Sequence, residues 1–282
     1  MPVVRCASAC PGLDPGSGVT VLPDIKNFAY KVLRSSVPPT GTNRSGAVVC
    51  MRRLVAFALP RLSMSLPPFP DLVQRIAARL DRPMPGTEAQ VTMAPRYSAR
   101  KNAVSVNGRD CREAGVLALI YADGDTPTLV LTVRRDDLPD HPGQVSFPGG
   151  QREDGETLQE TALREAQEEV DLNPAPVRIH GALTSLYIPP SNFCVHPFVG
   201  TLDSAPTLKP TDREVGEILH VPLKNLLDPS RRVVEPWDLH GVTIEVPYYA
   251  VGGHTVWGAT AMMLAELVAV VRDAVEGVHP KP

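Results

Sequence analysis

The segment FPGGQREDGETLQETALREAQEEVDL, residues 147–172, decides the fold of this 282-residue chain. Its helix-forming stretch, Thr157–Val170, carries Glu165, Glu168 and Glu169 at positions i, i+3 and i+4. At about 100° per residue, this spacing places three carboxylates on one face of a helix. Like charges at this spacing repel by roughly 0.2–0.5 kcal/mol per pair, so the pattern predicts a cation between them. Hard oxygen ligands favour Mg²⁺ or Mn²⁺.

A second face of the same helix is apolar and small, as expected for packing against a sheet. This stripe consists of Ala162, Leu163, Ala166 and Val170. The loop before the helix holds Gly149 and Gly150, whose backbones reach angles that other residues avoid. A carbonyl of this loop can therefore turn toward the same cation, so that loop and helix make one site.

The segment resembles the Nudix box, Gly-x5-Glu-x7-Arg-Glu-U-x-Glu-Glu-x-Gly-U, in which U is aliphatic. The positions that match at the required intervals are Gly150, Glu156, Arg164, Glu165, Ala166, Glu168, Glu169 and Leu172. Because all of these would have to coincide, the match argues against an ordinary solvated, charged helix. The departure is Asp171 in the final glycine position. We expect a small cost there, because aspartate tolerates a left-handed cap less well than glycine.

This resemblance implies both a fold and an activity. The fold is α/β, a Nudix-type α/β/α sandwich with a mixed sheet. The activity is hydrolysis of a diphosphate linkage with Mg²⁺ or Mn²⁺ as cofactor. The implied metal ligands are the carboxylates of Glu165, Glu168 and Glu169 and the carbonyl of Gly149. Metals held there would neutralise the diphosphate and activate a water for attack on phosphorus.

The resemblance gives the other box residues supporting roles in catalysis. Arg164 is implied to pair with Glu156 and so to hold the loop against the helix. The sequence does not fix the general base. Candidates for that role are first Glu168 or Glu165, and then Glu214 or Glu217 from a later segment.

A preceding stretch narrows the resemblance. Residues 131–150, LTVRRDDLPDHPGQVSFPGG, are similar to a motif of the coenzyme A diphosphatase branch, Leu-Thr-x-Arg-Ser-x-x-Leu-x-x-His-x-Gly-Gln-Val-x-Phe-Pro-Gly-Gly. Arg135 stands where serine is usual. Residues 191–200 and 257–260 are also similar to this branch, so the resemblance covers roughly residues 112–275. It implies cleavage of coenzyme A or acyl-CoA into 3′,5′-ADP and a 4′-phosphopantetheine.

Coenzyme A also carries a 3′-phosphate, which requires cationic or hydrogen-bonding partners. The candidate substrate-binding residues are Arg134, Arg135, His141 and Gln144. Each of the cationic candidates has a plainer alternative, a solvated charge or an ordinary hydrogen bond. Two other functions stay open: a Nudix pyrophosphatase acting on nucleotide sugars or nucleoside triphosphates, and a non-catalytic nucleotide-sensing Nudix module. The intact carboxylates favour an enzyme.

Charge divides the chain into unlike parts. Residues 1–63 hold eight Lys/Arg and two Asp/Glu, a charge of +6, so the remainder carries −3 − 6 = −9. We expect residues 1–63 to be a disordered or extraneous extension, 64–111 to form a helix and linker, 112–275 to form the Nudix domain and 276–282 to be a tail. The acidic remainder disfavours nucleic acid.

The cysteines and the hydropathy pattern favour a cytoplasmic protein. No run approaches the roughly 18 apolar residues of a membrane helix. The cysteines are odd in number and irregularly spaced, which predicts neither disulfides nor a zinc site and favours a reducing compartment. We expect Cys111 and Cys194 to be buried apolar residues. The expected partner is a small-molecule diphosphate, with no nucleic acid and no membrane, and a homodimer is left open.

Periodicity predicts the remaining elements. Helices are expected at Pro70–Leu80, at Leu223–Leu227 as a single turn, and at Ala259–Val275. Strands are expected at Gly115–Tyr121, Thr128–Val133, Ile179–Leu186, Phe193–Leu202, Glu217–Val221 and Val242–Tyr249. The first two strands should pair as a hairpin. His196 and His254 are expected to be structural.

Overall fold

A computed structural model describes residues 65–96, 103–138, 142–211, 214–239 and 241–277 of the chain. The expectations for residues 1–63 and for the placement of His141 lie outside the described residues. None of the helices that the structure describes is long and apolar enough to span a membrane.

The elements lie close to where periodicity places them. The helices are α1 (Phe69–Leu80), α2 (Gly86–Gln90), α3 (Leu158–Val170), α4 (Leu223–Leu227) and α5 (Gly258–Glu276), with 3-10 turns η3 (Val91–Met93) and η6 (Pro229–Arg231). The strands are β1 (Arg112–Asp123), β2 (Thr126–Arg134), β3 (Val145–Ser146), β4 (Gly149–Gln151), β5 (Arg178–Ala182), β6 (Leu186–Ile188), β7 (Phe193–Leu202), β8 (Val215–Pro222), β9 (Arg232–Leu239), β10 (Val242–Val251) and β11 (His254–Trp257).

Strand β1 is the centre of an eight-stranded mixed sheet. It pairs antiparallel with β2 and β4 and parallel with β7. The main path runs β3-β2-β1-β7-β5, and β8 joins it at β2 while β6 joins it at β7. The expected β1–β2 hairpin is confirmed, with Asp123 opposite Thr126. A separate three-stranded sheet has the order β11-β10-β9.

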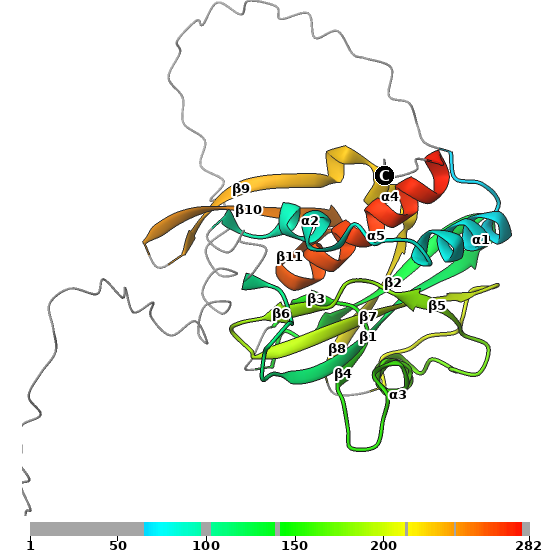
Figure 1. The fold of residues 1–282 in the computed structure, drawn as a ribbon, viewed down its shortest axis with the longest axis horizontal. Coiled ribbons are helices and arrows are strands. Elements are labelled where there is room, and N and C mark those ends of the chain that lie inside the picture. Colours follow the sequence, from blue (N-terminus) through cyan, green and yellow to red (C-terminus); the bar gives the residue numbers. More distant parts are fainter. Residues whose placement is uncertain (1–64, 97–102, 139–141, 212–213, 240, 278–282) are drawn as a thin grey trace, which may run out of the picture.

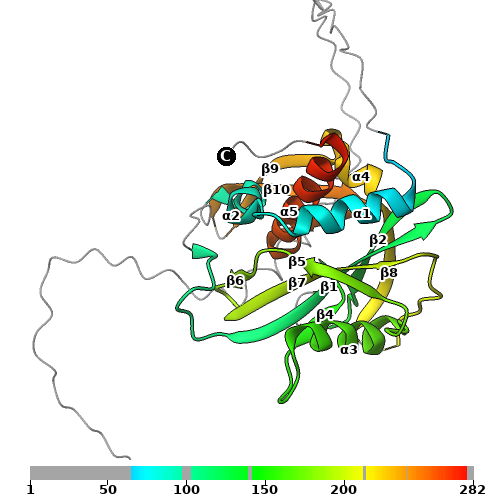
Figure 2. The same cartoon turned by 45° about the vertical axis from the view of Figure 1, so that its right-hand side comes forward.

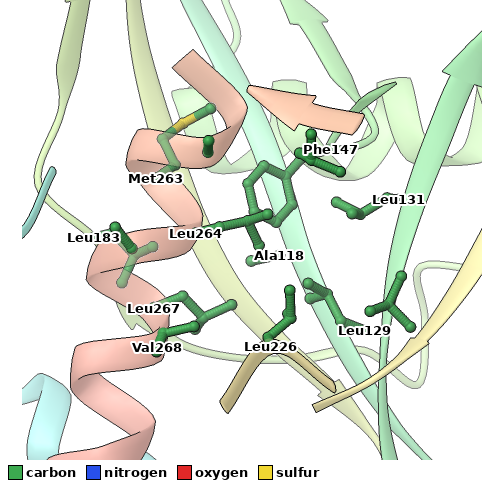
Figure 3. Packing of buried hydrophobic residues seen from close by; sticks show 14 of the residues in the cluster. Ala118, Leu129, Leu131, Phe147, Leu183, Leu226, Met263, Leu264, Leu267 and Val268 are labelled. Carbon is green, nitrogen blue, oxygen red and sulfur yellow. The ribbon is translucent and has the colours of Figure 1, made fainter. Parts of the chain in front are cut away.

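The sheet lies between two helical layers, which confirms the expected sandwich. Helix α3 covers one face, whereas α1 and α5 cover the other (Figures 1 and 2). Side chains of β1 alternate between the two cores: Leu117 and Leu119 pack with α3, whereas Ala118 and Ile120 pack with α5. Figure 3 shows α5 residues Met263, Leu264, Leu267 and Val268 around Ala118, Leu129, Leu131 and Phe147.

Helix α2 and the strands β3, β4, β9 and β11 were not predicted, and one predicted strand is divided. The expected strand Ile179–Leu186 is two strands, β5 and β6, because the chain leaves the sheet between them and Thr184 turns toward α5. Strand β9 was not predicted, since Pro236 and several charged residues hide its strand pattern. Strand β9 is stabilised by its antiparallel pairing with β10, a contact that local sequence does not show.

The expectation that Cys111 and Cys194 are unlinked apolar residues is wrong, because the two form a disulfide with a Cα–Cα distance of 5.8 Å. Cys194 is buried, and Cys111 is half-buried directly before β1. The parallel pairing of β1 with β7 places the starts of both strands side by side. The two cysteines are 83 residues apart, so their spacing alone could not reveal the link.

Helix α5 carries a fully buried carboxylate, Glu266. Its oxygens accept hydrogen bonds from the backbone N–H groups of Gly86 (2.9 Å) and Thr184 (3.0 Å). They also accept from the Gln90 amide (2.9 Å) and the Thr184 hydroxyl (2.7 Å). A buried carboxylate is tolerated only when its oxygens are satisfied in this way. Glu266 therefore fastens α2 and the segment before β6 to α5.

Replacing Glu266 by glutamine should lower the free energy of unfolding by about 2–4 kcal/mol, because an amide NH₂ would then face other donors. Denaturant titration of the variant measures this change. Glu276→Gln, the same replacement at the exposed end of α5, is the control and should stay within about 0.5 kcal/mol of the wild type. Equal effects of the two substitutions would contradict the role of Glu266.

Candidate active site

Helix α3 begins at a capping box. The Thr157 hydroxyl accepts from the Glu160 backbone N–H at 3.3 Å, and the Glu160 carboxylate accepts from the Thr157 backbone N–H at 2.8 Å. This reciprocal pair satisfies two of the free donors at the start of a helix. The cap fixes where the helix begins and therefore which way its glutamates face.

The helix packs against the centre of the sheet. The apolar stripe expected from the sequence is confirmed, with Ala162, Ala166 and Val170 fully buried and Leu163 half-buried. At Gly115 on β1, a Cβ atom would lie 2.2 Å from the Leu158 carbonyl oxygen. Only glycine permits this approach, so β1 and α3 form one rigid unit.

The glycine loop, defined as residues 149–157, brings backbone against the α3 carboxylates. A Cβ on Gly150 would lie 2.5 Å from the Glu165 carboxyl carbon, so the missing side chain provides the space for that carboxylate. Gly149 has φ +152° and its N–H donates to Glu169 at 3.2 Å. Strand β4 therefore places both glycines beside Glu165 and Glu169, as the sequence predicts.

Arg164 connects the glycine loop to the helix. Its Nε donates to Glu156 at 2.5 Å, which confirms the predicted pairing, and its Nη2 donates to the Gln151 carbonyl at 3.2 Å. Its Nη1 donates to Glu165 at 2.9 Å and to Glu168 at 3.2 Å. One guanidinium thus bonds both ends of the loop and two of the three α3 carboxylates.

The electrostatics of the two bonded carboxylates differ. Burial raises the pKa of Glu165 above its usual value, Arg164 opposes this shift, and the charges of Glu168 and Glu156 add to it. The hydrogen bond from Arg164 lowers the pKa of Glu156 to about 2. Glu156 is therefore an anion at neutral pH that anchors Arg164, whereas Glu165 is a half-buried acid whose charged form a further cation would stabilise.

The donor set fits a hard divalent metal. Among the described residues, no three His, Cys, Asp or Glu side chains converge as a preformed metal site. Glu168 is 58% exposed and bonded to Arg164, so its carboxylate must turn to join the other two. The Glu165 carboxylate fills the space that Gly150 leaves, and burial there raises its pKa, so a cation beside α3 would stabilise its charged form.

The C-terminal end of α3 is also fixed. Asp171 adopts the left-handed conformation, with φ +58°, that the glycine of the box would adopt easily. Its carboxylate lies 3.1 Å from Lys209 Nζ. The backbone N–H of Thr211 donates to the Glu169 carbonyl at 3.0 Å. The segment after β7 therefore closes the helix end and compensates the replaced glycine.

The predicted substrate-binding arginines lie at the end of β2, and each pairs with a carboxylate. Arg134 ends β2 and pairs with Glu214 at 2.5 Å, and its backbone N–H donates to the Gln144 carbonyl at 2.9 Å. Arg135 pairs with Asp137 at 2.7 Å.

The structure does not bring Glu217 to α3. Glu217 is opposite Val133, whose side chain packs with the α5 core, and it lies 3.2 Å from His254. A position on the opposite face of the sheet removes Glu217 from the acids beside the glycine loop. The candidates for the general base that remain near this loop are Glu165 and Glu168, with Glu214 at the edge of the sheet.

A polar cluster beside the glycine loop was not predicted from the sequence. Glu113 on β1 pairs with Arg152 at 2.8 Å and lies 3.8 Å from His196 Nε2. The Nδ1 atom of His196 is 2.8 Å from the Ser185 hydroxyl. These residues come from four separate segments, so no local spacing connects them.

Comparison with known proteins gives the family. The family model described as NUDIX domain matches residues 112–238. A protein named "Uncharacterized Nudix hydrolase NudL" from Pectobacterium atrosepticum is 36% identical over 167 residues, which are 57% of this chain and 84% of that protein. The chain belongs to the Nudix hydrolase family. A relative of the same name from Yersinia pestis is 36% identical over 163 residues, which are 57% of this chain and 80% of that protein.

Solved Nudix structures are similar at lower identity. A Nudix hydrolase from M. smegmatis, RenU, is 16% identical with a TM-score of 0.41, and the match covers 61% of this chain and 89% of that one. A MutT/nudix family protein from Enterococcus faecalis is 16% identical with a TM-score of 0.42, covering 58% and 63%. As a Nudix hydrolase the chain acts on pyrophosphate bonds, a reaction for which this family generally uses divalent metal ions.

The anchor between Glu156 and Arg164 predicts a specific pH dependence. Because the pKa of Glu156 is lowered from 4.5 to about 2, its stabilising contribution is fully present above pH 4.5 and is lost as the pH falls toward 2. Glu156→Gln should be less stable than the wild type at neutral pH and should lose less stability over that acid range. Thermal melts at successive pH values measure this difference.

Asp154→Asn removes an exposed acid from the same loop and is the control for this experiment. Its melting curve should follow the wild type across the acid range. Parallel pH dependence of Glu156→Gln and the wild type would contradict the assignment of the low pKa to the Arg164 pair.

Proposed function

We propose that this Nudix hydrolase cleaves the diphosphate of coenzyme A or acyl-CoA, giving 3′,5′-ADP and a 4′-phosphopantetheine. The observation that carries the proposal is the meeting of segments that separately resemble the coenzyme A branch. The Thr260 hydroxyl, in residues 257–260, donates to the Val145 carbonyl, in residues 131–150, at 2.9 Å within the buried core. Two segments that are far apart in the chain thus meet directly before the glycine loop.

The described residues of the first of these segments lead from β2 to the glycine loop before α3. Strand β2 pairs with β3 through Thr132 and Ser146, and the turn between them closes with the Gly143 N–H donating to the Arg134 carbonyl at 3.0 Å. Phe147 is buried in the α5 core, which fixes the backbone directly before Gly149. The segment therefore supports both the metal-binding backbone and a surface beside it.

The chain's own residues supply the binding and orientation that the reaction needs. Carboxylates of Glu165, Glu168 and Glu169 and the Gly149 carbonyl would hold Mg²⁺ or Mn²⁺, and the bound ion would neutralise the diphosphate and lower the pKa of a water. Arg164 keeps the glycine loop in place through Glu156. In this proposal Glu165 or Glu168 would accept the proton of the attacking water.

We assign recognition of the 3′-phosphate to Arg134, the last residue of β2, and to Arg135, which follows it. Arg134 and Arg135 are 29% and 44% exposed, and each pairs with one carboxylate that is more exposed than itself. Exposed pairs of this kind contribute little stability, so a phosphate can replace the carboxylate at small cost. Gln144 and His141 complete the proposed set. A cytoplasmic location stays a prediction.

Glu168→Gln should reduce kcat about 100-fold or more with coenzyme A and Mg²⁺, because it removes a charged metal ligand without removing volume. The melting temperature should stay close to that of the wild type, since this side chain is 58% exposed. Steady-state kinetics and thermal melts provide the two measurements. Activity within threefold of the wild type would exclude Glu168 from the metal set, and Glu276→Gln controls for the lost charge.

Coenzyme A should be cleaved about 10- to 100-fold faster than its 3′-dephospho form, because a charge-assisted contact of roughly 1.5–3 kcal/mol is missing in the latter. Arg134→Gln or Arg135→Gln should shrink this preference and leave cleavage of the dephospho compound nearly unchanged. Equal rates on both compounds would reject 3′-phosphate recognition. Cleavage of a nucleotide sugar without cleavage of any coenzyme A species would reject the proposed substrate and retain the Nudix chemistry.

A further inference from the structure

The glycine loop has a second charged anchor in addition to Arg164. Arg152 begins the turn directly after β4, and its Nη2 atom lies 2.8 Å from Glu113 Oε2. The Arg152 backbone N–H also donates to the Glu113 carbonyl at 2.9 Å. Backbone and side chain of Arg152 are therefore both held by the same residue of β1.

Glu113 lies in a part of β1 that is held by strand pairing, a disulfide and close packing against α3. It is opposite Cys194 in the β1–β7 register, and Cys194 forms the disulfide with Cys111, two residues before Glu113. Two residues after Glu113, Gly115 is in close contact with the backbone of α3. The carboxylate of Glu113 is thus held on the same strand against which the catalytic helix packs.

The imidazole of His196 lies on the other side of Glu113. Its Nε2 atom is buried without a hydrogen-bond partner, 3.8 Å from Glu113 Oε1. Burial lowers the pKa of His196, Arg152 lowers it further and Glu113 opposes the shift. The ring is therefore neutral at neutral pH, and Arg152 is the cation that the Glu113 carboxylate holds.

We propose that Glu113 is a positioning residue for the proposed metal site, acting through Arg152 on the glycine loop. Arg152 follows Gly149, Gly150 and Gln151, which pair with β1. The Gly149 N–H donates to Glu169, and Gly150 lies against the Glu165 carboxylate. Arg164 holds the loop at Glu156 and at the Gln151 carbonyl, and Glu113 holds it at Arg152. Together the two anchors fix the distance between the Gly149 carbonyl and the carboxylates of α3.

The size of the effect follows from the exposure of the pair. The Glu113 and Arg152 side chains are 35% and 45% exposed, so their pairing is worth at most about 1 kcal/mol. If the pairing stabilises the metal-binding conformation of the glycine loop by this amount, its loss corresponds to a roughly fivefold change in metal affinity. The same energy spread over the whole fold would shift the melting temperature by only a few degrees.

The test is calorimetric titration of the whole chain with Mn²⁺ in the absence of substrate. Glu113→Gln should weaken Mn²⁺ binding about threefold to fivefold with little change in melting temperature. Glu153→Gln removes the same charge from a neighbouring, exposed position of the same polar pocket and should bind Mn²⁺ like the wild type. Arg152→Gln should weaken binding as much as Glu113→Gln, and the double variant no further than either.

Each outcome decides the proposal. Wild-type affinity in Glu113→Gln, an equal loss in Glu153→Gln, or additive losses in the double variant would overturn it. Absence of Mn²⁺ binding by the wild type would overturn the proposed metal site together with this role. Because no substrate is present, the result is independent of whether coenzyme A is the molecule cleaved.

Discussion

The close approach of α3 to β1 is the constraint on which the rest of the structure depends. Gly115 cannot carry a Cβ atom without meeting the Leu158 carbonyl at 2.2 Å. This contact joins α3 to the strand that also pairs with β4. As a result Gly149 and Gly150 lie against Glu169 and Glu165 without a flexible connection. Preorganised geometry of this kind is what catalysis on a diphosphate requires.

The arrangement concentrates negative charge beside that rigid unit. Arg164 is one guanidinium with bonds to Glu156, Glu165 and Glu168. Its charge is largely committed to Glu156, whose pKa falls to about 2, while the pKa of Glu165 is raised. The protein therefore leaves the α3 carboxylates short of positive charge. A divalent cation is complementary to that deficit, and the bound cation would in turn attract the phosphates of a substrate.

The sequence predicted the parts of the molecule that depend on local spacing. Helix α3 and its apolar stripe follow from positions within residues 147–172, and the resemblance to the Nudix box implied the pairing of Arg164 with Glu156. The parts that depend on long-range pairing could not be predicted. The Cys111–Cys194 disulfide depends on the parallel register of β1 and β7, and strand β9 depends on β10. The contacts of Glu266 join residues up to 180 positions apart, so periodicity carries no signal for them. The metal and substrate roles of the candidate residues stay predictions.

An anomalous difference map from crystals grown with Mn²⁺ would show where the chain binds a metal ion. We expect a peak bonded to the Gly149 carbonyl and to carboxylates of Glu165 and Glu169, with Glu168 turned away from Arg164 toward the metal. Such a peak would show that the glycine loop and α3 form one metal centre. At saturating Mn²⁺, no peak beside α3, or a peak bonded only to other acids, would contradict the account.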